Sequence, residues 1–264
     1  MNAREKAHHD KPFLYQELFE LCRLVDAFLT KCNTVKIKGQ DDFAFMGLCF
    51  LNRQIKQSEV ILKLIDKGYD MDAQLINRSQ MEGLVFFLWT ANDRSKRALR
   101  WRTFGYIEEW RSIQRKIKIK KQYNKKRLTY LKRKLSEYGN IHLKKKAKSK
   151  AGIKDPYARY WYGELKIFDI MKDLDGEQLY DVIYRRYSAW HHWNPLPFEE
   201  VLISKDDKIY YSHSSDPTSA TILAHGFQCL WRTTQIVNNH LNLNFDKKLN
   251  DINSEFISWH KRTE

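Results

Sequence analysis

The sequence predicts an all-α protein: a multi-helix bundle with a basic helical arm and one small β-hairpin insertion. Two observations support this prediction. Only ten Gly and five Pro occur in 264 residues, while 30% of the residues are charged, a composition that favours long helices over turn-rich β architectures. Apolar residues also recur at helical spacing through most of the chain. With 42% hydrophobic residues, the chain can bury one substantial core, and we expect residues 1–264 to form a single helical domain.

Two amphipathic helices are predicted first. Apolar residues recur at intervals of three and four over residues 12–32, and a polar stretch follows. A second, longer helix is expected from Asp42, because its apolar residues keep the helical period up to Gly68. Gly68 is a good C-terminal cap.

The next helix is predicted to be the central one. Asp70 can cap it, and residues 71–91 are apolar on nearly every side in their second half. A further element over residues 94–136 alternates aromatic and apolar positions with increasing basic content. We expect this element to project from the body as a hairpin arm, with residues 138–157 as a basic loop.

The C-terminal third continues the helical pattern with one exception. Short helical stretches are predicted at 164–174 and at 177–193, the second ended by the Pro-containing segment 194–197. Residues 201–212 alternate around Asp206 and Asp207, which predicts the β-hairpin. A helix over residues 216–239 and a last one ending near Trp259 complete the pattern.

The positive charge is concentrated in one segment. The formal net charge is +15, and residues 111–150 hold 17 Lys or Arg against one acid, leaving 30 basic and 31 acidic residues elsewhere. Such a run predicts a basic helical arm and loop that attracts phosphates; the alternative is a solvated face without a partner. Tyr123, Tyr130 and Tyr138 lie among these cations and are candidates for base stacking. The candidate nucleic-acid contacts are Lys120, Lys121, Lys125, Lys126, Arg127, Lys132, Arg133, Lys144, Lys145 and Lys146.

Several protein classes are not expected. The four Cys are scattered without a CxxC pair, as is typical of buried thiols in a reducing compartment, so we expect a cytoplasmic protein. The N-terminal residues lack the apolar body of a secretory signal, and no apolar window is long enough to cross a bilayer. His213 and His225 could join other histidines at a metal, but no ligand spacing favours this. We expect neither a metal nor a cofactor.

The densest polar constellation lies at residues 184–192. Arg185, Ser188 and His192 fall at spacings of three and four, which places them on one helical face, and Arg186 and His191 lie at adjacent angles. A guanidinium can stabilise charge on a phosphate, and an imidazole can move a proton near neutral pH. The group suits phosphodiester cleavage without a metal. The alternative is an ordinary polar helix end, where the dipole favours a cation.

At these residues the sequence resembles the HEPN superfamily, small helical bundles whose ribonuclease members carry Arg, a spacer of four to six residues, and His. Pairing Arg185 or Arg186 with His191 or His192 gives spacers within this range, and the resemblance leaves the choice of Arg open. Residues 64–89 also resemble a bacterial HEPN-related family of uncharacterised proteins. In that family a helix bearing Arg and Glu precedes a Tyr, Ser and His motif, and the matching residues here are Arg78, Glu82, Tyr184, Ser188 and His192.

Arg78 and Glu82 lie one helical turn apart in apolar surroundings, so burial requires that their charges be paired. They could form a structural ion pair. Alternatively, Glu82 could orient His192 or an Arg, as a supporting group fixes a catalytic imidazole.

The resemblance implies a metal-independent endoribonuclease, acting as a toxin or antiviral defence effector, in which the ribose 2′-hydroxyl attacks the neighbouring phosphate. It also implies an RNA substrate such as tRNA or mRNA, a homodimer, and an antitoxin or defence-system partner protein. The alternative is a non-catalytic nucleic-acid-binding or adaptor module that uses the basic arm.

Overall fold

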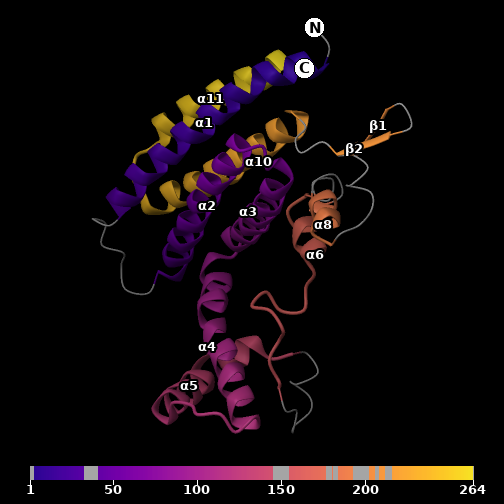
Figure 1. The fold of residues 1–264 in the computed structure, drawn as a ribbon. Helices are drawn as coiled ribbons and strands as arrows, with labels where there is room; N and C mark the ends of the chain where they lie inside the picture. Colours follow the sequence, from indigo (N-terminus) through magenta and orange to yellow (C-terminus); the bar gives the residue numbers. More distant parts are fainter. Residues whose placement is uncertain are drawn as a thin grey trace.

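The computed structural model describes residues 3–32, 41–144, 155–176, 180, 184–192, 202–205, 208–211 and 216–263. These residues are mostly helical, which confirms the predicted fold class in its coarse form (Figure 1). No helix in these ranges is long and apolar enough to cross a membrane.

Five long helices form the body of the molecule. α10 contacts α1, α2 and α3, while α11 lies along α1 and also contacts α10 (Figure 1). The first helix begins nine residues earlier than residue 12, where the sequence pattern placed its start. The five helices are α1 (Ala3–Cys32), α2 (Asp42–Asp66), α3 (Asp70–Ala91), α10 (Asp216–Leu241) and α11 (Asp246–Thr263).

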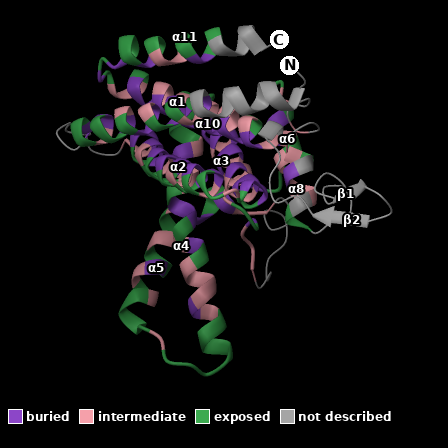
Figure 2. Ribbon diagram, turned by 45° about the horizontal axis from the view of Figure 1, so that its top comes forward, coloured by how far each residue is buried: buried purple, intermediate pink, exposed green. Residues whose placement is uncertain are grey.

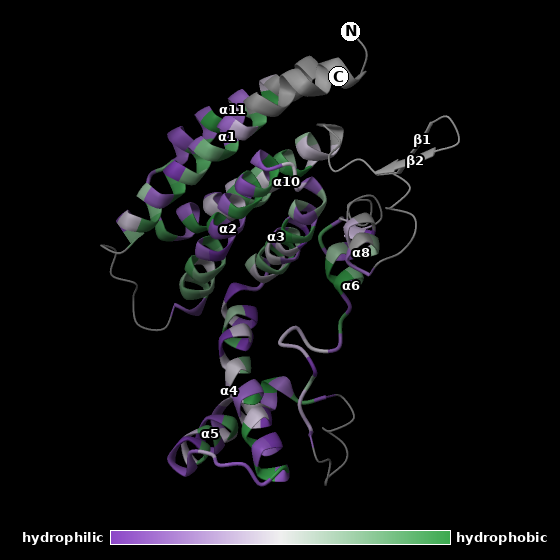
Figure 3. Cartoon of the chain, in the orientation of Figure 1, coloured by the Kyte–Doolittle hydropathy of each residue, from purple (hydrophilic) through white to green (hydrophobic). Residues whose placement is uncertain are grey.

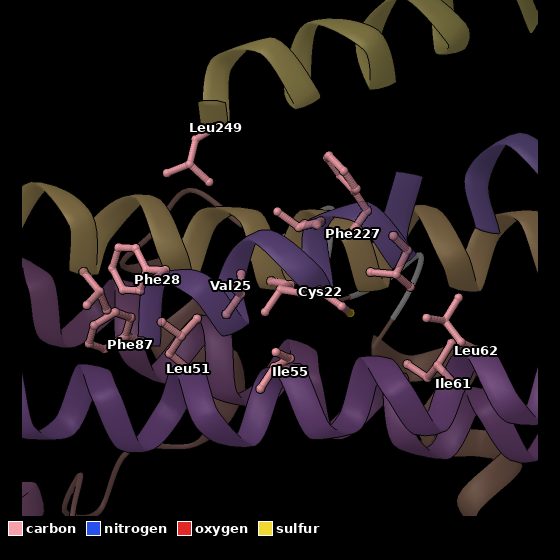
Figure 4. Packing of buried hydrophobic residues seen from close by; sticks show 14 of the residues in the cluster. Cys22, Val25, Phe28, Leu51, Ile55, Ile61, Leu62, Phe87, Phe227 and Leu249 are labelled. Atoms are coloured by element: carbon pink, nitrogen blue, oxygen red, sulfur yellow. The ribbon is translucent and has the colours of Figure 1, made fainter. Parts of the chain in front are cut away.

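Apolar side chains from all five of these helices fill the core (Figure 4). Phe28 of α1, Leu51 of α2 and Phe227 of α10 are fully buried. Phe87 of α3 stacks on Phe43 with the ring centroids 5.1 Å apart. Burying a side chain of this size stabilises a fold by about 1.5–3 kcal/mol, so the core holds α3 firmly in place.

The ends of α2 follow the sequence prediction. Asp41 precedes the helix and its carboxylate accepts a hydrogen bond from the Ala44 amide at 2.9 Å. The helix ends at Asp66, and Gly68 has a φ of 77°. Glycine adopts this left-handed conformation without a steric cost, which confirms its role after the helix end.

The start of α3 differs from the prediction. Asp70 was expected as its cap, but Tyr69 occupies the cap position and Asp70 is the first helical residue. The Asp70 side chain is buried and accepts a 2.6 Å hydrogen bond from the Ser219 hydroxyl of α10. The carboxylate therefore joins two helices of the body, a long-range contact that local sequence patterns do not reveal.

The arm consists of two helices, α4 (Arg94–Lys118) and α5 (Lys125–Tyr138), followed by the 3-10 helix η1 (Gly139–His142). The sequence pattern predicted a hairpin arm over residues 94–136 without placing its turn. The chain turns after α4, with Lys120 at a φ of 54°, and Asn124 caps α5 by accepting from the Arg127 amide at 3.0 Å. The hairpin projects from the body and is largely exposed (Figure 2).

The remaining described elements are short: α6 (Ile167–Lys172), α8 (Arg185–His191), β1 (Leu202–Lys205) and β2 (Lys208–Tyr211). The strands pair antiparallel with Leu202 opposite Tyr211. The predicted turn at Asp206 and Asp207 lies outside the described residues. Both α6 and α8 contact α3, so α3 is central to the packing, as the sequence predicted.

Candidate functional site

The candidate site lies where α8 packs against α3. Tyr187 anchors the short helix: it is 3% exposed and packs with Met81 and Leu84 of α3 and with Cys229 of α10. Its hydroxyl forms a 2.9 Å hydrogen bond with Nδ1 of His225. Burial lowers the pKa of His225 to about 4, so this imidazole is neutral near pH 7 and serves the packing of α8.

Arg78, Glu82 and Tyr184 form one hydrogen-bonded group, which we call the Tyr184 cluster. Arg78 Nη2 lies 3.2 Å from both the Tyr184 hydroxyl and Glu82 Oε1, and the hydroxyl donates to Glu82 Oε1 at 3.0 Å. The Arg78 side chain is 17% exposed and that of Glu82 34%. Burial is the main cause that raises the pKa of Tyr184, which keeps its hydroxyl protonated as a donor.

The cluster contains the ion pair that the sequence predicted between Arg78 and Glu82. Within the described residues, Glu82 bonds to Arg78 and Tyr184, and not to His192. No contact among the described residues therefore supports the expectation that Glu82 orients the His192 imidazole. The contact with Arg78 is the structural ion pair of the first alternative.

The two histidines lie at the C-terminal end of α8. His191 and His192 are exposed, with ring centroids 4.9 Å apart. The His192 amide donates to the Ser188 carbonyl at 3.0 Å, and the Ser188 side chain is half-buried. Arg185 is exposed, whereas the side chain of Arg186 lies outside the described residues. Both imidazoles are accessible to a large substrate.

A pocket of about 350 Å³ opens beside the cluster, between α2, α3 and the start of α4. Glu82 lines it, together with the aromatic rings of Phe50, Phe86 and Trp101. Arg53 lies exposed at the same pocket. The sequence does not reveal this pocket, because its walls come from three helices.

The arm presents most of its predicted cations to solvent. The exposed ones are Lys120, Lys121, Lys125, Lys126, Arg127, Lys132 and Arg133. Arg127 is paired with Glu109 through two 2.7 Å contacts, so its charge is partly neutralised. Lys144 is half-buried and donates to the Asp155 carbonyl at 3.0 Å. Lys145 and Lys146 lie outside the described residues.

The tyrosines of the arm differ from the expectation. Tyr130 and Tyr138 are half-buried, and their rings lie 6.2 and 6.3 Å from that of Tyr106. The Arg127 guanidinium also lies 4.7 Å from the Tyr130 ring centroid. These rings join α5 to α4 and are engaged within the arm, which leaves Tyr123 in the connecting loop as the candidate for base stacking.

Metal ligands are not gathered in the described part of the chain. No group of three or more His, Cys, Asp or Glu side chains is placed there to hold a metal ion. His225 bonds to Tyr187, and His213 lies outside the described residues.

Fold and site together define a helical-bundle protein with a polar cluster between two helices and a projecting basic arm. The family of unknown function DUF5677 matches residues 44–209, and the chain belongs to this family. The match covers both halves of the Tyr184 cluster as well as the arm. No curated protein and no solved structure matches the chain.

Proposed function

We propose that this protein is a metal-independent endoribonuclease of the HEPN type that acts as a toxin or antiviral defence effector. The observation that supports this best is the Tyr184 cluster, in which the first residue of the 184–192 motif bonds to two residues of α3 more than 100 positions away. Three of the five residues that the resemblance assigns thus lie in contact beside α8: Arg78, Glu82 and Tyr184. His191 and His192 extend this group to the protein surface.

The cleavage chemistry follows from the groups present. The ribose 2′-oxygen loses its proton to an imidazole of His191 or His192 and attacks the adjacent phosphorus. The bond from phosphorus to the 5′-oxygen breaks, and the leaving oxygen takes up a proton. A guanidinium from Arg185 or Arg186 stabilises the charge on the phosphorane-like transition state. The products carry a 2′,3′-cyclic phosphate and a 5′-hydroxyl.

The Tyr184 cluster acts as a positioning group. Tyr184 directly precedes α8, and its hydroxyl bonds to Arg78 and Glu82. These bonds fix the beginning of the helix that carries the histidines. Small displacements of catalytic groups cost large factors in rate. The proposal extends by analogy to a homodimer, and to an antitoxin or defence-system protein that restrains it.

The direct test incubates purified protein with total bacterial RNA in chelator and examines the fragment ends. We expect fragments ending in 2′,3′-cyclic phosphate with the wild type, and intact RNA with the His191→Ala, His192→Ala double variant. Both side chains are exposed, so the variant should unfold at the wild-type temperature. Cleavage that requires an added divalent metal, or that survives in the double variant, would refute the proposal.

A paired substitution tests the positioning group. Tyr184→Phe removes the hydroxyl between Arg78 and Glu82 but keeps the ring that stacks on Tyr180. Tyr187→Phe is the matched control, because its hydroxyl bonds to the buried His225 and not to the cluster. We expect kcat to fall about tenfold or more in Tyr184→Phe, with KM nearly unchanged. Equal losses in both variants would indicate a purely structural role.

A second candidate function is a non-catalytic nucleic-acid-binding module, favoured by the exposed cations of the arm. Neutralising phosphates releases counterions, so affinity would fall with salt at a slope of about 0.9 per phosphate on duplex DNA and about 0.7 on single strands. Replacing Lys120, Lys121, Lys125 and Lys126 by Gln should flatten this slope. Salt-dependent binding without cleavage would favour this function over the nuclease.

A further inference from the structure

A second pocket lies at the root of the arm, where α4 leaves the body. It encloses about 420 Å³, in the range of small-molecule sites. Three cations of α4 line it: Lys96, Arg97 and Arg100. They occupy the first two turns of the helix, and the opposite wall comes from residues 141–143 and 158–165, which follow the arm.

Arg100 is the unusual residue of this pocket. Its side chain is half-buried, and burial lowers the pKa of its guanidinium. Among the described residues no carboxylate pairs with it, and its buried Nε has no hydrogen-bond partner. A desolvated charge without a partner is costly to a fold. The cost is offset when an anion occupies the pocket beside it.

The chain backbone packs closely over this guanidinium. Gly163 has a φ of 92°, and a Cβ at this position would lie 3.1 Å from Arg100 Nη2. Only a glycine leaves both the turn and the guanidinium undisturbed. The Gly163 backbone thus packs over Arg100 and adds no side-chain charge at this position.

The neighbouring charges leave the pocket with a positive balance. The Arg97 guanidinium lies 3.9 Å from the Trp89 ring centroid and donates to the Trp89 carbonyl. Asp93 and Glu164 also line the pocket, but neither forms an ion pair with its cations among the described residues. Three positive and two negative side chains therefore leave one formal positive charge.

We propose that this pocket binds a phosphomonoester. Such a group carries a charge of about −1.5 to −2 near neutral pH, and guanidinium groups bind its oxygens through paired, charge-assisted hydrogen bonds. Arg100 and Arg97 hold the phosphate, and the exposed Lys96 lies near the opening. The source of the group is a free nucleotide or the 5′ end of a nucleic acid. The inference is independent of RNA cleavage at α8.

Calorimetric titration of the full-length protein with AMP and with adenosine tests the site. We expect AMP to bind and adenosine to bind at least about tenfold more weakly, since the charged hydrogen bonds are lost. Arg100→Gln should weaken AMP binding by a similar factor. The matched control Arg115→Gln removes the same charge from an exposed position on the same helix and should bind AMP as the wild type does.

A second readout separates a ligand site from a packing role. Ligand-free Arg100→Gln should unfold at or above the wild-type temperature, because the residue removed is an unpaired, desolvated cation. Lys96→Gln is exposed and provides a variant that folds in any case; we expect AMP binding about threefold weaker. Equal affinity of AMP for wild type, Arg100→Gln and Lys96→Gln would overturn the proposal, as would equal binding of AMP and adenosine.

To identify the source of the phosphate, binding is measured for two trinucleotides that differ only in a 5′-phosphate or 5′-hydroxyl end. A 5′-phosphorylated trinucleotide that binds more tightly than both AMP and the 5′-hydroxyl form indicates a nucleic-acid end. AMP binding as tight as that of the phosphorylated trinucleotide indicates a free nucleotide. Equal binding of the phosphorylated and hydroxyl forms, unaffected by Arg100→Gln, would contradict the site.

Discussion

The body and the arm of this protein are stabilised in different ways. Hydrophobic residues run through α2, α3 and α10, while hydrophilic residues dominate the far end of the arm (Figure 3). In α5, Leu131 is the one buried residue. The α4–α5 contact also includes the exposed Glu109–Arg127 pair and rings around Tyr106.

This difference separates two tasks. A close-packed core holds side chains in fixed positions, which suits the Tyr184 cluster on α3. An arm with few buried apolar contacts opens locally at a lower free energy, and it can present cations to a polyanion. Under the proposed function, the body holds the catalytic groups and the arm attracts the nucleic acid.

The largest effect on stability is expected from the body. Phe87 is fully buried and contacts Phe43 and Phe50, so Phe87→Ala should lower the free energy of unfolding by about 3–5 kcal/mol. The arm control is Ile119→Ala, at a residue 59% exposed, which should change it by less than about 0.5 kcal/mol. Urea unfolding followed by circular dichroism measures both. Similar losses in the two variants would show that the arm shares the cooperative core.

Each region also contains one buried neutral histidine, which provides a comparison by pH. Burial lowers the pKa of His225 in the body and of His142 in the arm to about 4, below the ordinary value near 6.5. The unfolded chain therefore takes up protons first as pH falls. The contribution of each neutral histidine to the free energy of unfolding is fully present above about pH 6.5. It declines as pH falls toward 4, by up to about 3 kcal/mol per histidine.

The dependence of the unfolding free energy on pH must be compared between variants, because Glu17 stabilises the fold as pH falls while the two histidines destabilise it. Burial, with the nearby Glu255 carboxylate, raises the pKa of Glu17 to about 7, so its contribution improves as pH falls from 7 to 4.5. We expect His225→Gln and His142→Gln each to flatten the acid decline between pH 6.5 and 4. An unchanged slope in either variant would show that the histidine is protonated in the folded protein.

Much of the body could be predicted because its signals are local. Asp41 before α2 and Gly68 after it mark the helix ends, and the apolar period identifies the buried faces. The hairpin was expected, but its turn could not be placed, because residues 119–124 contain no Gly or Pro and Lys120 adopts a positive φ. Asp70 was misassigned because Ser219, its partner, lies on a distant helix.

The site was predictable only as a set of residues. The resemblance to the HEPN-related family suggested Arg78, Glu82 and Tyr184, and these three side chains are in contact. The sequence could not reveal that Tyr187 is buried and bonded to His225, nor that Arg100 has no carboxylate partner among the described residues. Both facts depend on what covers a side chain in three dimensions, which spacing along one helix does not encode.

A small effect is expected for an ion pair at the arm. Arg111 bonds to Asp155 at 2.9 Å and also donates to the Tyr157 and Ala158 carbonyls, while Asp155 is 41% exposed. A double-mutant cycle with Arg111→Gln and Asp155→Asn should give a coupling of about 0.5–1 kcal/mol. Because the pair is accessible to solvent, the coupling should shrink in 1 M salt, whereas the loss in Phe87→Ala should persist. A coupling that salt does not reduce would mean that this part of the arm is as shielded from water as the body.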